Sequence, residues 1–186
     1  MSSYTSAEKQ LLLNIAQDSI NEGLTKKQPL NVRVLDYSDN LRQKRACFVT
    51  LEKKGALRGC IGSLQAYRPL VDDIASNAFS AAFRDPRFSA LTSEEYKEIS
   101  IHISILSLPE SMQFDSEADL VRQIRHGIDG LILTEGDHRG TFLPSVWDQL
   151  PNANLFLMHL KNKAGLPSNY WSKTLRVERY ATEVIE

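Results

Sequence analysis

The sequence predicts an α+β fold with a mainly antiparallel sheet and helices packed on it. Two hairpin patterns are interspersed with helical segments, without the regular strand–helix alternation that is typical of a parallel sheet. Residues 99–105 (Ile-Ser-Ile-His-Ile-Ser-Ile) alternate strictly between apolar and polar side chains. This alternation predicts an antiparallel strand with an isoleucine face toward the core and a Ser/His/Ser face on the other side.

The N-terminal region is predicted to be one helix followed by a polar loop. Residues 5–8 (Thr-Ser-Ala-Glu) form a capping-box pattern, and apolar residues follow at helical spacing. Gly23 is expected to end this helix, because glycine readily takes the left-handed conformation. Residues 24–45 are mixed and polar, and we expect a solvated loop with one short strand at 32–35.

The middle of the chain is predicted to be a hairpin and a helix. Residues 46–51 and 56–63 are strand candidates on either side of a Lys-Lys-Gly turn, in which Gly55 supplies a positive φ. The helix begins near Pro69, which is tolerated in a first turn, and runs to about Phe83.

Caps and turn residues predict the remaining elements. They are a short helical turn after a capping box at 92–95, helices at 115–125 and 153–164, a hairpin formed by 128–134 and 140–143, and a final strand at 175–180.

Composition narrows the function classes. The 186 residues, 42% of them hydrophobic, fit a single domain over residues 1–186. Lys and Arg number 22 against 23 Asp and Glu, a balance that argues against nonspecific nucleic-acid binding. We find neither an apolar run of the roughly 20 residues that span a membrane nor a secretory signal. Two cysteines are too few for a disulfide scaffold, so we expect a soluble, cytoplasmic protein.

The segment Leu-Arg-Gly-Cys-Ile-Gly at residues 57–62, here named the signature segment, carries the strongest chemical pattern. On a regular strand, Arg58, Cys60 and Gly62 share one face, and an arginine beside a cysteine favours the thiolate. The two glycines of this strand, Gly59 and Gly62, predict a bulge or a close approach of another group. This pattern predicts a site for a small anionic ligand or a reactive thiol. The alternative is a cysteine that packs as a small apolar residue, with Arg58 paired to a carboxylate.

The same alternation places Leu57 and Ile61 on the core side. The position of Cys47 depends on the hairpin turn. A three-residue turn sets Phe48 opposite Cys60, whereas a two-residue turn sets Cys47 opposite Cys60. A stable disulfide is not expected in a reducing cytosol.

The signature segment resembles that of the AMMECR-one domain family, whose bacterial members are called AmmeMemoRadiSam system protein A. Further segments resemble the family in the right order, at residues 48–51, 85–88, 103–106, 126–128, 143–147 and 163–167. The resemblance implies an α+β fold with a larger and a smaller part, and a cleft near the signature segment. It also implies association with a Memo-like protein and a radical S-adenosylmethionine protein, but it implies no established reaction.

Three further residues fall in the matching segments. Asp85 and Arg87 follow the central helix, where they can present a carboxylate and a guanidinium suited to bidentate recognition. The alternative is an Asp cap with an Arg that ties two helices together. His126 precedes the second hairpin, as an acid–base candidate or as a turn residue that donates to the backbone.

The leading hypothesis is a ligand-binding or accessory module that acts with the Memo-like and radical enzyme partners. Its ligand-binding candidates are Arg58, Gly59, Gly62, Asp85, Arg87 and His126. The competing hypothesis is an enzyme in which Cys60 is the catalytic nucleophile, Arg58 stabilises charge, and His126 or Asp85 transfers a proton.

A third hypothesis, a nucleic-acid-associated factor, rests only on basic residues in 24–45 and 53–54, which lack interleaved aromatic residues. Neither a cofactor nor a metal is expected, because the sequence has no CxxC, HExxH, Rossmann or P-loop motif.

Overall fold

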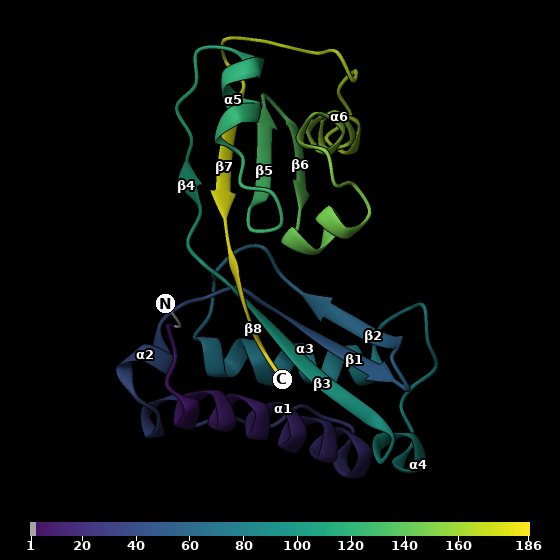
Figure 1. Cartoon of the computed structure of the whole chain (residues 1–186). Helices are drawn as coiled ribbons and strands as arrows, with labels where there is room; N and C mark the ends of the chain where they lie inside the picture. The colour runs from purple at the N-terminus through teal and green to yellow at the C-terminus, as the bar shows by residue number, and fades with distance from the viewer. Residues whose placement is uncertain (1–2) are drawn as a thin grey trace. The chain divides into compact units, whose positions relative to one another are not determined.

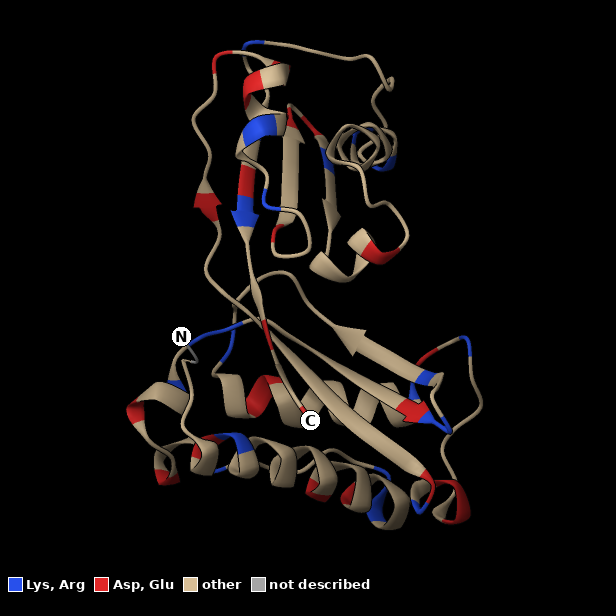
Figure 2. Cartoon of the chain, viewed as in Figure 1, with Lys and Arg blue, Asp and Glu red and all other residues tan. Residues whose placement is uncertain are grey.

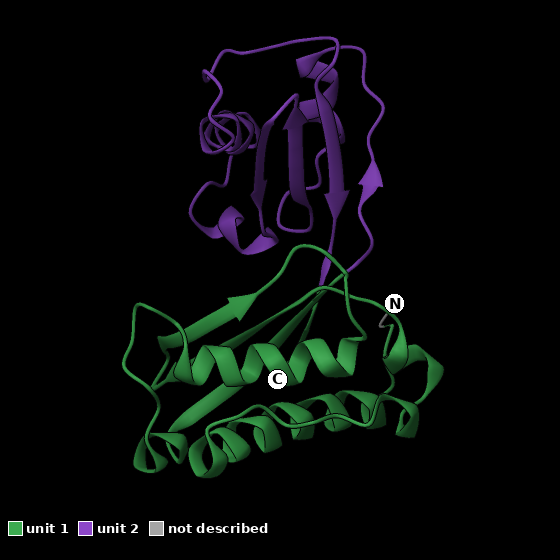
Figure 3. Cartoon of the chain, turned by 180° about the vertical axis from the view of Figure 1, so that it is seen from behind, with its two compact units in different colours: residues 1–106, 183–186 green, residues 107–182 purple. Residues whose placement is uncertain are grey.

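The computed structural model describes residues 3–186, which form two compact units. The larger unit runs to Leu106 and includes Glu183–Glu186, and the smaller unit is Ser107–Thr182 (Figure 3). Each unit has its own four-stranded sheet, and the strand pairings described are antiparallel. The predicted α+β class is therefore confirmed.

In the larger unit, two long helices cover one face of the sheet (Figure 1). The strand order is β2-β1-β3-β8. The strands are β1 (Cys47–Lys53), β2 (Ala56–Gly62), β3 (Ile99–Leu106) and β8 (Thr182–Ile185). The helices are α1 (Ser6–Lys26), α2 (Asp39–Arg42), α3 (Leu70–Phe83) and α4 (Ser93–Tyr96), with a 3₁₀ helix at Val34–Asp36.

The core of this unit lies between α1, α3 and the sheet. It includes Ile103 and Ile105 of β3, while Ile99 and Ile101 pack against it partly buried. The prediction of an isoleucine core face on β3 is therefore confirmed.

Helix α1 begins as predicted but ends later. The Thr5 hydroxyl accepts from the Glu8 backbone N–H, and the Glu8 carboxylate accepts from the Thr5 N–H, which completes the capping box. The helix continues past Gly23 and ends at Lys26, and the capping residue Lys27 takes the left-handed conformation with φ 60°. The predicted end at Gly23 is wrong. A Cβ at Gly23 would lie 2.1 Å from the ring of Phe83, so this glycine allows α1 to pack closely on α3.

The predicted strand at 32–35 is also wrong. Residues 34–36 form the 3₁₀ helix instead, and its backbone bonds are local, from Asp36 N–H to Arg33 O and from Tyr37 N–H to Val34 O. The alternation of residues 32–35 is too short to outweigh these local bonds.

The smaller unit has the strand order β4-β7-β5-β6. Its strands are β4 (Glu110–Ser111), β5 (Gly130–Glu135), β6 (His138–Phe142) and β7 (Arg176–Tyr180), and its helices are α5 (Glu117–Gln123), α6 (Ala153–Lys163) and a 3₁₀ helix at Pro144–Asp148. The predicted second hairpin is confirmed, but its turn is two residues, Gly136 and Asp137. The two-residue strand β4 and the last strand β8 were not predicted from the sequence.

Buried polar groups fix the helices of the smaller unit. Lys161 of α6 is fully buried, and its Nζ lies 2.7 Å from the carboxylate of Glu117 on α5. Asp129 is also fully buried and binds the guanidinium of Arg125, while its backbone oxygen accepts from the indole of Trp147. These contacts satisfy groups that would otherwise be costly to bury.

Charged residues of both signs are present in each unit (Figure 2). Among residues 3–186, no helix combines the length and the apolar character that a membrane span requires.

Candidate functional site

The signature segment lies on β2, and a β-bulge interrupts its pairing with β1. Leu51 is opposite Gly59, but the next residue, Glu52, is opposite Leu57, so Arg58 is the extra residue of the bulge. Leu57 is 45% exposed and Arg58 only 7% exposed, so the expectation that Leu57 faces the core is wrong. The bulge is the physical reason, because an extra residue breaks the alternation of faces along a strand.

Arg58 is held by a carboxylate and a backbone carbonyl. Its Nε and Nη2 atoms donate to the two oxygens of Glu95 at 3.1 and 2.8 Å, and Nη2 also donates to Ser89 O at 2.9 Å. The Arg58 hydrogen bonds lower the pKa of Glu95 to about 2. Among the described residues, Nη1 of Arg58 is buried without a hydrogen-bond partner.

The two glycines of the segment are sites of close approach to the chain's own atoms. A Cβ on Gly59 would lie 2.2 Å from the carbonyl oxygen of Ala81 on α3. A Cβ on Gly62 would lie 2.4 Å from Cys47 O and 2.4 Å from the ring of Phe48. Both glycines therefore let neighbouring backbone and side chains pack directly on β2.

Asp85 and Arg87 close the outer edge of β2, which is the first strand of its sheet. The Cys60 N–H donates to Asp85 Oδ2 at 2.9 Å, and Arg87 Nη2 donates to Cys60 O at 3.3 Å. The same Arg87 binds Asp85 at 2.7 Å. These two side chains satisfy backbone groups that would otherwise pair with another strand. The Arg87 hydrogen bonds hold the pKa of Asp85 well below its usual range.

The two cysteines lie in different environments. Cys60 is partly buried, and its Sγ lies 3.2 Å from the hydroxyl of Thr50, the residue directly opposite on β1. Cys47 is completely buried beside Asp73, and burial raises the pKa of its thiol. The predicted registers place Phe48 or Cys47 opposite Cys60, and both registers are wrong. The bulge and the two-residue turn together set Phe48 opposite Gly62.

The structure brings Arg58, Cys60, Asp85 and Arg87 together on and beside β2. The guanidinium carbons of Arg58 and Arg87 each lie 5.6 Å from the ring centre of Phe88. His126 belongs to the smaller unit, where it is exposed and its ring centre lies 4.8 Å from that of Trp147.

Sequence reasoning missed three members of this cluster, Thr50, Phe88 and Glu95. Glu95 had a visible signal as the last residue of a capping box, and it does accept from the Thr92 N–H. Its second partner, Arg58, lies 37 residues away in the sequence, and no local pattern indicates that contact.

Residues 13–185 match the sequence model of the AMMECR1 family. The chain belongs to the AMMECR1 family. This match includes the whole cluster on β2, and the resemblance drawn from the signature segment is confirmed.

Similar proteins in the AMMECR1 family include archaeal ones. The chain is 40% identical over 183 residues to a protein of Methanothermobacter thermautotrophicus, covering 95% of this chain and 93% of the relative. It is 36% identical over 158 residues to a protein of Methanocaldococcus jannaschii, covering 81% of this chain and 77% of the relative. The crystal structure of an uncharacterized protein from Pyrococcus horikoshii is similar, with a TM-score of 0.83 and 31% identity over 98% of this chain and 93% of that one.

Proposed function

We propose that this AMMECR1-family chain is a binding module, and that the cluster on β2 recognises an anionic group. The observation that carries the proposal is Nη1 of Arg58, a buried donor that has no acceptor among residues 3–186. Leaving a buried donor unsatisfied costs free energy, on the order of 1–3 kcal/mol for a neutral group and more for a charged one. An oxyanion that gained access to Nη1 would satisfy this donor.

The neighbours of Arg58 suit such a ligand. Arg58 and Arg87 are arranged around one aromatic ring, that of Phe88, so two cations lie near each other. The side chain of Arg87 is 53% exposed and so can be reached from solvent. Guanidinium groups bind carboxylates and phosphates through paired hydrogen bonds.

Inorganic phosphate is the probe that tests this proposal. We expect phosphate to shift the amide NMR signals of Gly59 and Cys60, and Arg58→Lys to weaken its binding about tenfold, because lysine loses the planar fork. Glu95→Gln is the matched control, since it removes the charge of the same ion pair and keeps every donor of Arg58. Equal weakening by both variants, or no shift at Gly59 and Cys60, would contradict the proposal.

We further propose that the module acts together with a Memo-like protein and a radical S-adenosylmethionine protein in the cytoplasm. This step rests on the family resemblance. Co-purification of the three proteins tests it. Arg58→Lys should reduce recovery of the complex, while Glu95→Gln should not. A complex that never forms would remove the partner proposal and leave the phosphate experiment unaffected.

Thiol chemistry at Cys60 is the second candidate function, because this residue is only partly buried and its Sγ lies within hydrogen-bond distance of the Thr50 hydroxyl. The catalytic roles assigned from the sequence need revision. The carboxylate of Asp85 is paired with Arg87 and accepts a hydrogen bond from the Cys60 N–H. It is therefore unsuited to accept a proton at neutral pH. Arg87 rather than Arg58 is the cation with exposed surface near Cys60.

Alkylation of the native protein by iodoacetamide tests this candidate. We expect Cys60 to react about a hundredfold faster than Cys47, because Cys47 is completely buried and burial raises the pKa of its thiol. A Cys47→Ala variant isolates the signal of Cys60. If Cys60 stays unmodified until the protein is denatured, nucleophilic catalysis by this residue is eliminated.

A further inference from the structure

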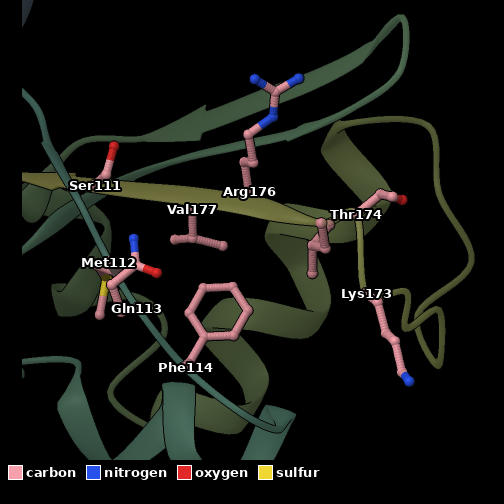
Figure 4. Close-up of a pocket in the computed structure, with 9 residues that line it drawn as sticks. Ser111, Met112, Gln113, Phe114, Lys173, Thr174, Arg176 and Val177 are labelled. Atoms are coloured by element: carbon pink, nitrogen blue, oxygen red, sulfur yellow. The ribbon is translucent and has the colours of Figure 1, made fainter.

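A pocket of about 540 Å³ lies in the smaller unit, between β7 and the chain at residues 111–114 (Figure 4). Its surface offers little to a ligand. Three of its lining residues, Met112, Leu175 and Val177, are nearly fully buried. The hydroxyl of a fourth, Thr174, already donates to the carboxylate of Glu135 at 2.7 Å. A more specific arrangement of polar side chains lies in the larger unit, on the face of the sheet opposite α1 and α3.

Three polar side chains are neighbours on this face. Glu52 of β1 is directly opposite Ser100 of β3, and His102 lies two residues further along β3. Leu51 and Ile103, which are next to them in the two strands, are fully buried in the core under the helices. Successive side chains of a strand point to opposite faces, so the three polar residues share the other face. The side chains of His102 and Glu52 are 24% and 37% exposed, and solvent reaches both.

The two ring nitrogens of His102 have different neighbours. Nδ1 lies 3.2 Å from Oε2 of Glu186, the residue that follows β8. Nε2 lies 3.2 Å from the hydroxyl of Ser100 and 3.6 Å from Oε2 of Glu52. A carboxylate at Nδ1 keeps the proton on that nitrogen and leaves Nε2 its lone pair. Nε2 and the carboxylate of Glu52 then face each other as two electron-pair donors.

We infer that Nε2 of His102 and the carboxylate of Glu52 bind a divalent transition-metal ion of the zinc type. Zinc takes imidazole nitrogen and carboxylate oxygen at about 2.0–2.2 Å, which sets two ligands of one tetrahedral ion roughly 3.4 Å apart. The observed 3.6 Å therefore requires almost no movement. Glu186 is the positioning residue, because a metal-binding histidine usually donates its other N–H to a carboxylate.

The protein supplies only part of the coordination shell. Among residues 3–186, no three His, Cys, Asp or Glu side chains are placed to hold one ion. The remaining positions therefore belong to the Ser100 hydroxyl and to water, and a zinc ion with exchangeable positions can take up a further ligand. No sequence motif indicates this site, because Glu52 and His102 become neighbours only when β1 pairs with β3. The site shares no residue with the cluster on β2 and does not depend on the function proposed for it.

A proton is the competing occupant of this site. An imidazolium between Glu52 and Glu186 would pair with both carboxylates and would need no metal. The two states differ at the nitrogens of His102. The imidazolium carries a proton on both, whereas the metal-bound ring carries a proton on Nδ1 and the ion on Nε2.

A titration of the native protein with zinc chloride at about pH 7.5, where an ordinary histidine is mostly neutral, separates the two occupants. Calorimetry measures the affinity, and ¹⁵N NMR of the imidazole rings reports which nitrogen binds. We expect saturable binding below about 1 mM zinc, a shift of the Nε2 signal of His102 and a retained proton on Nδ1. Magnesium, which prefers oxygen ligands, should leave the ring signals unchanged. An Nε2 signal of His102 that zinc does not move would overturn the inference.

Matched variants locate the ion. His102→Ala and Glu52→Gln should each weaken zinc binding at least about tenfold, because each removes one ligand. Glu186→Gln should weaken it about tenfold, the lower end of the effect of an outer hydrogen-bond partner, and should reduce the share of rings with the proton on Nδ1. His159→Ala on α6 and Glu94→Gln on α4 are the controls, since both residues are exposed elsewhere in the chain.

The controls should bind zinc as tightly as wild type. Equal weakening by His102→Ala and His159→Ala would show only general surface binding, and the inference would be wrong. Glu52→Gln with the affinity of wild type would equally overturn it, because the ion would then not join the two strands. An unchanged affinity and tautomer in Glu186→Gln would remove the positioning role of that residue.

Discussion

Gly59→Ala is expected to lower the free energy of unfolding by about 3 kcal/mol, the upper end of the usual cost of overpacking a core. The added methyl group would lie 2.2 Å from the carbonyl oxygen of Ala81, far inside van der Waals contact. The obstacle is helix backbone rather than a flexible side chain, so β2 and α3 must move apart. That movement would disturb the bulge that places Arg58 beside Glu95.

Urea denaturation followed by far-UV circular dichroism measures this effect. Tryptophan fluorescence is less suitable, because Trp147 and Trp171 both belong to the smaller unit. Gly55→Ala is the control. Gly55 has φ +77° and open space around it, so alanine there suffers only backbone strain of about 1 kcal/mol. A Gly59→Ala variant no less stable than Gly55→Ala would show that β2 is not tightly packed on α3.

The elements that the sequence predicted well have local causes. The strict alternation of residues 99–105 places β3, and the positive φ of Gly55 closes the first hairpin. The side chain of Asn152 caps α6 by accepting from the backbone N–H groups of Asn154 and Leu155. In each case the residues that form the structure are neighbours in the sequence, so their pattern is visible without knowledge of the fold.

The parts that could not be predicted depend on distant partners. An ideal strand places Arg58 beside Cys60, but the bulge that buries Arg58 becomes visible only once β1 is paired with β2. Asp85 was recognised as a candidate residue, yet its role at the edge of β2 depends on a bond to Cys60, 25 residues away. The strands β4 and β8 are short, and long-range pairing rather than propensity defines them.

Asp85→Asn is expected to lower the free energy of unfolding by about 2 kcal/mol at neutral pH, because the carboxylate accepts several charge-assisted hydrogen bonds. Asp85 is buried and accepts from the Cys60 N–H and from the backbone and guanidinium of Arg87. An asparagine oxygen can keep one of these bonds, but its NH₂ group faces another donor. The edge of β2 then loses the ion pair that closes it.

The same argument predicts a pH dependence. The pKa of Asp85 is lowered in the folded protein, chiefly by the Arg87 hydrogen bonds. The stabilising contribution is therefore fully present above the unfolded pKa of about 3.9, and is lost as the pH falls toward the folded value. Glu95, with its pKa lowered to about 2, contributes in the same direction.

The difference in the free energy of unfolding between wild type and Asp85→Asn should consequently be constant from neutral pH down to about pH 5. It should shrink at more acid pH, because the carboxyl of Asp85 then binds a proton in the unfolded chain while it is still ionised in the folded protein. Urea denaturation at a series of pH values measures it. Asp137→Asn, in the exposed turn between β5 and β6, is the control and should show little difference from wild type at any pH. A difference for Asp85→Asn that stays the same down to pH 2 would mean that the size of the side chain, rather than its charge, holds the edge of β2.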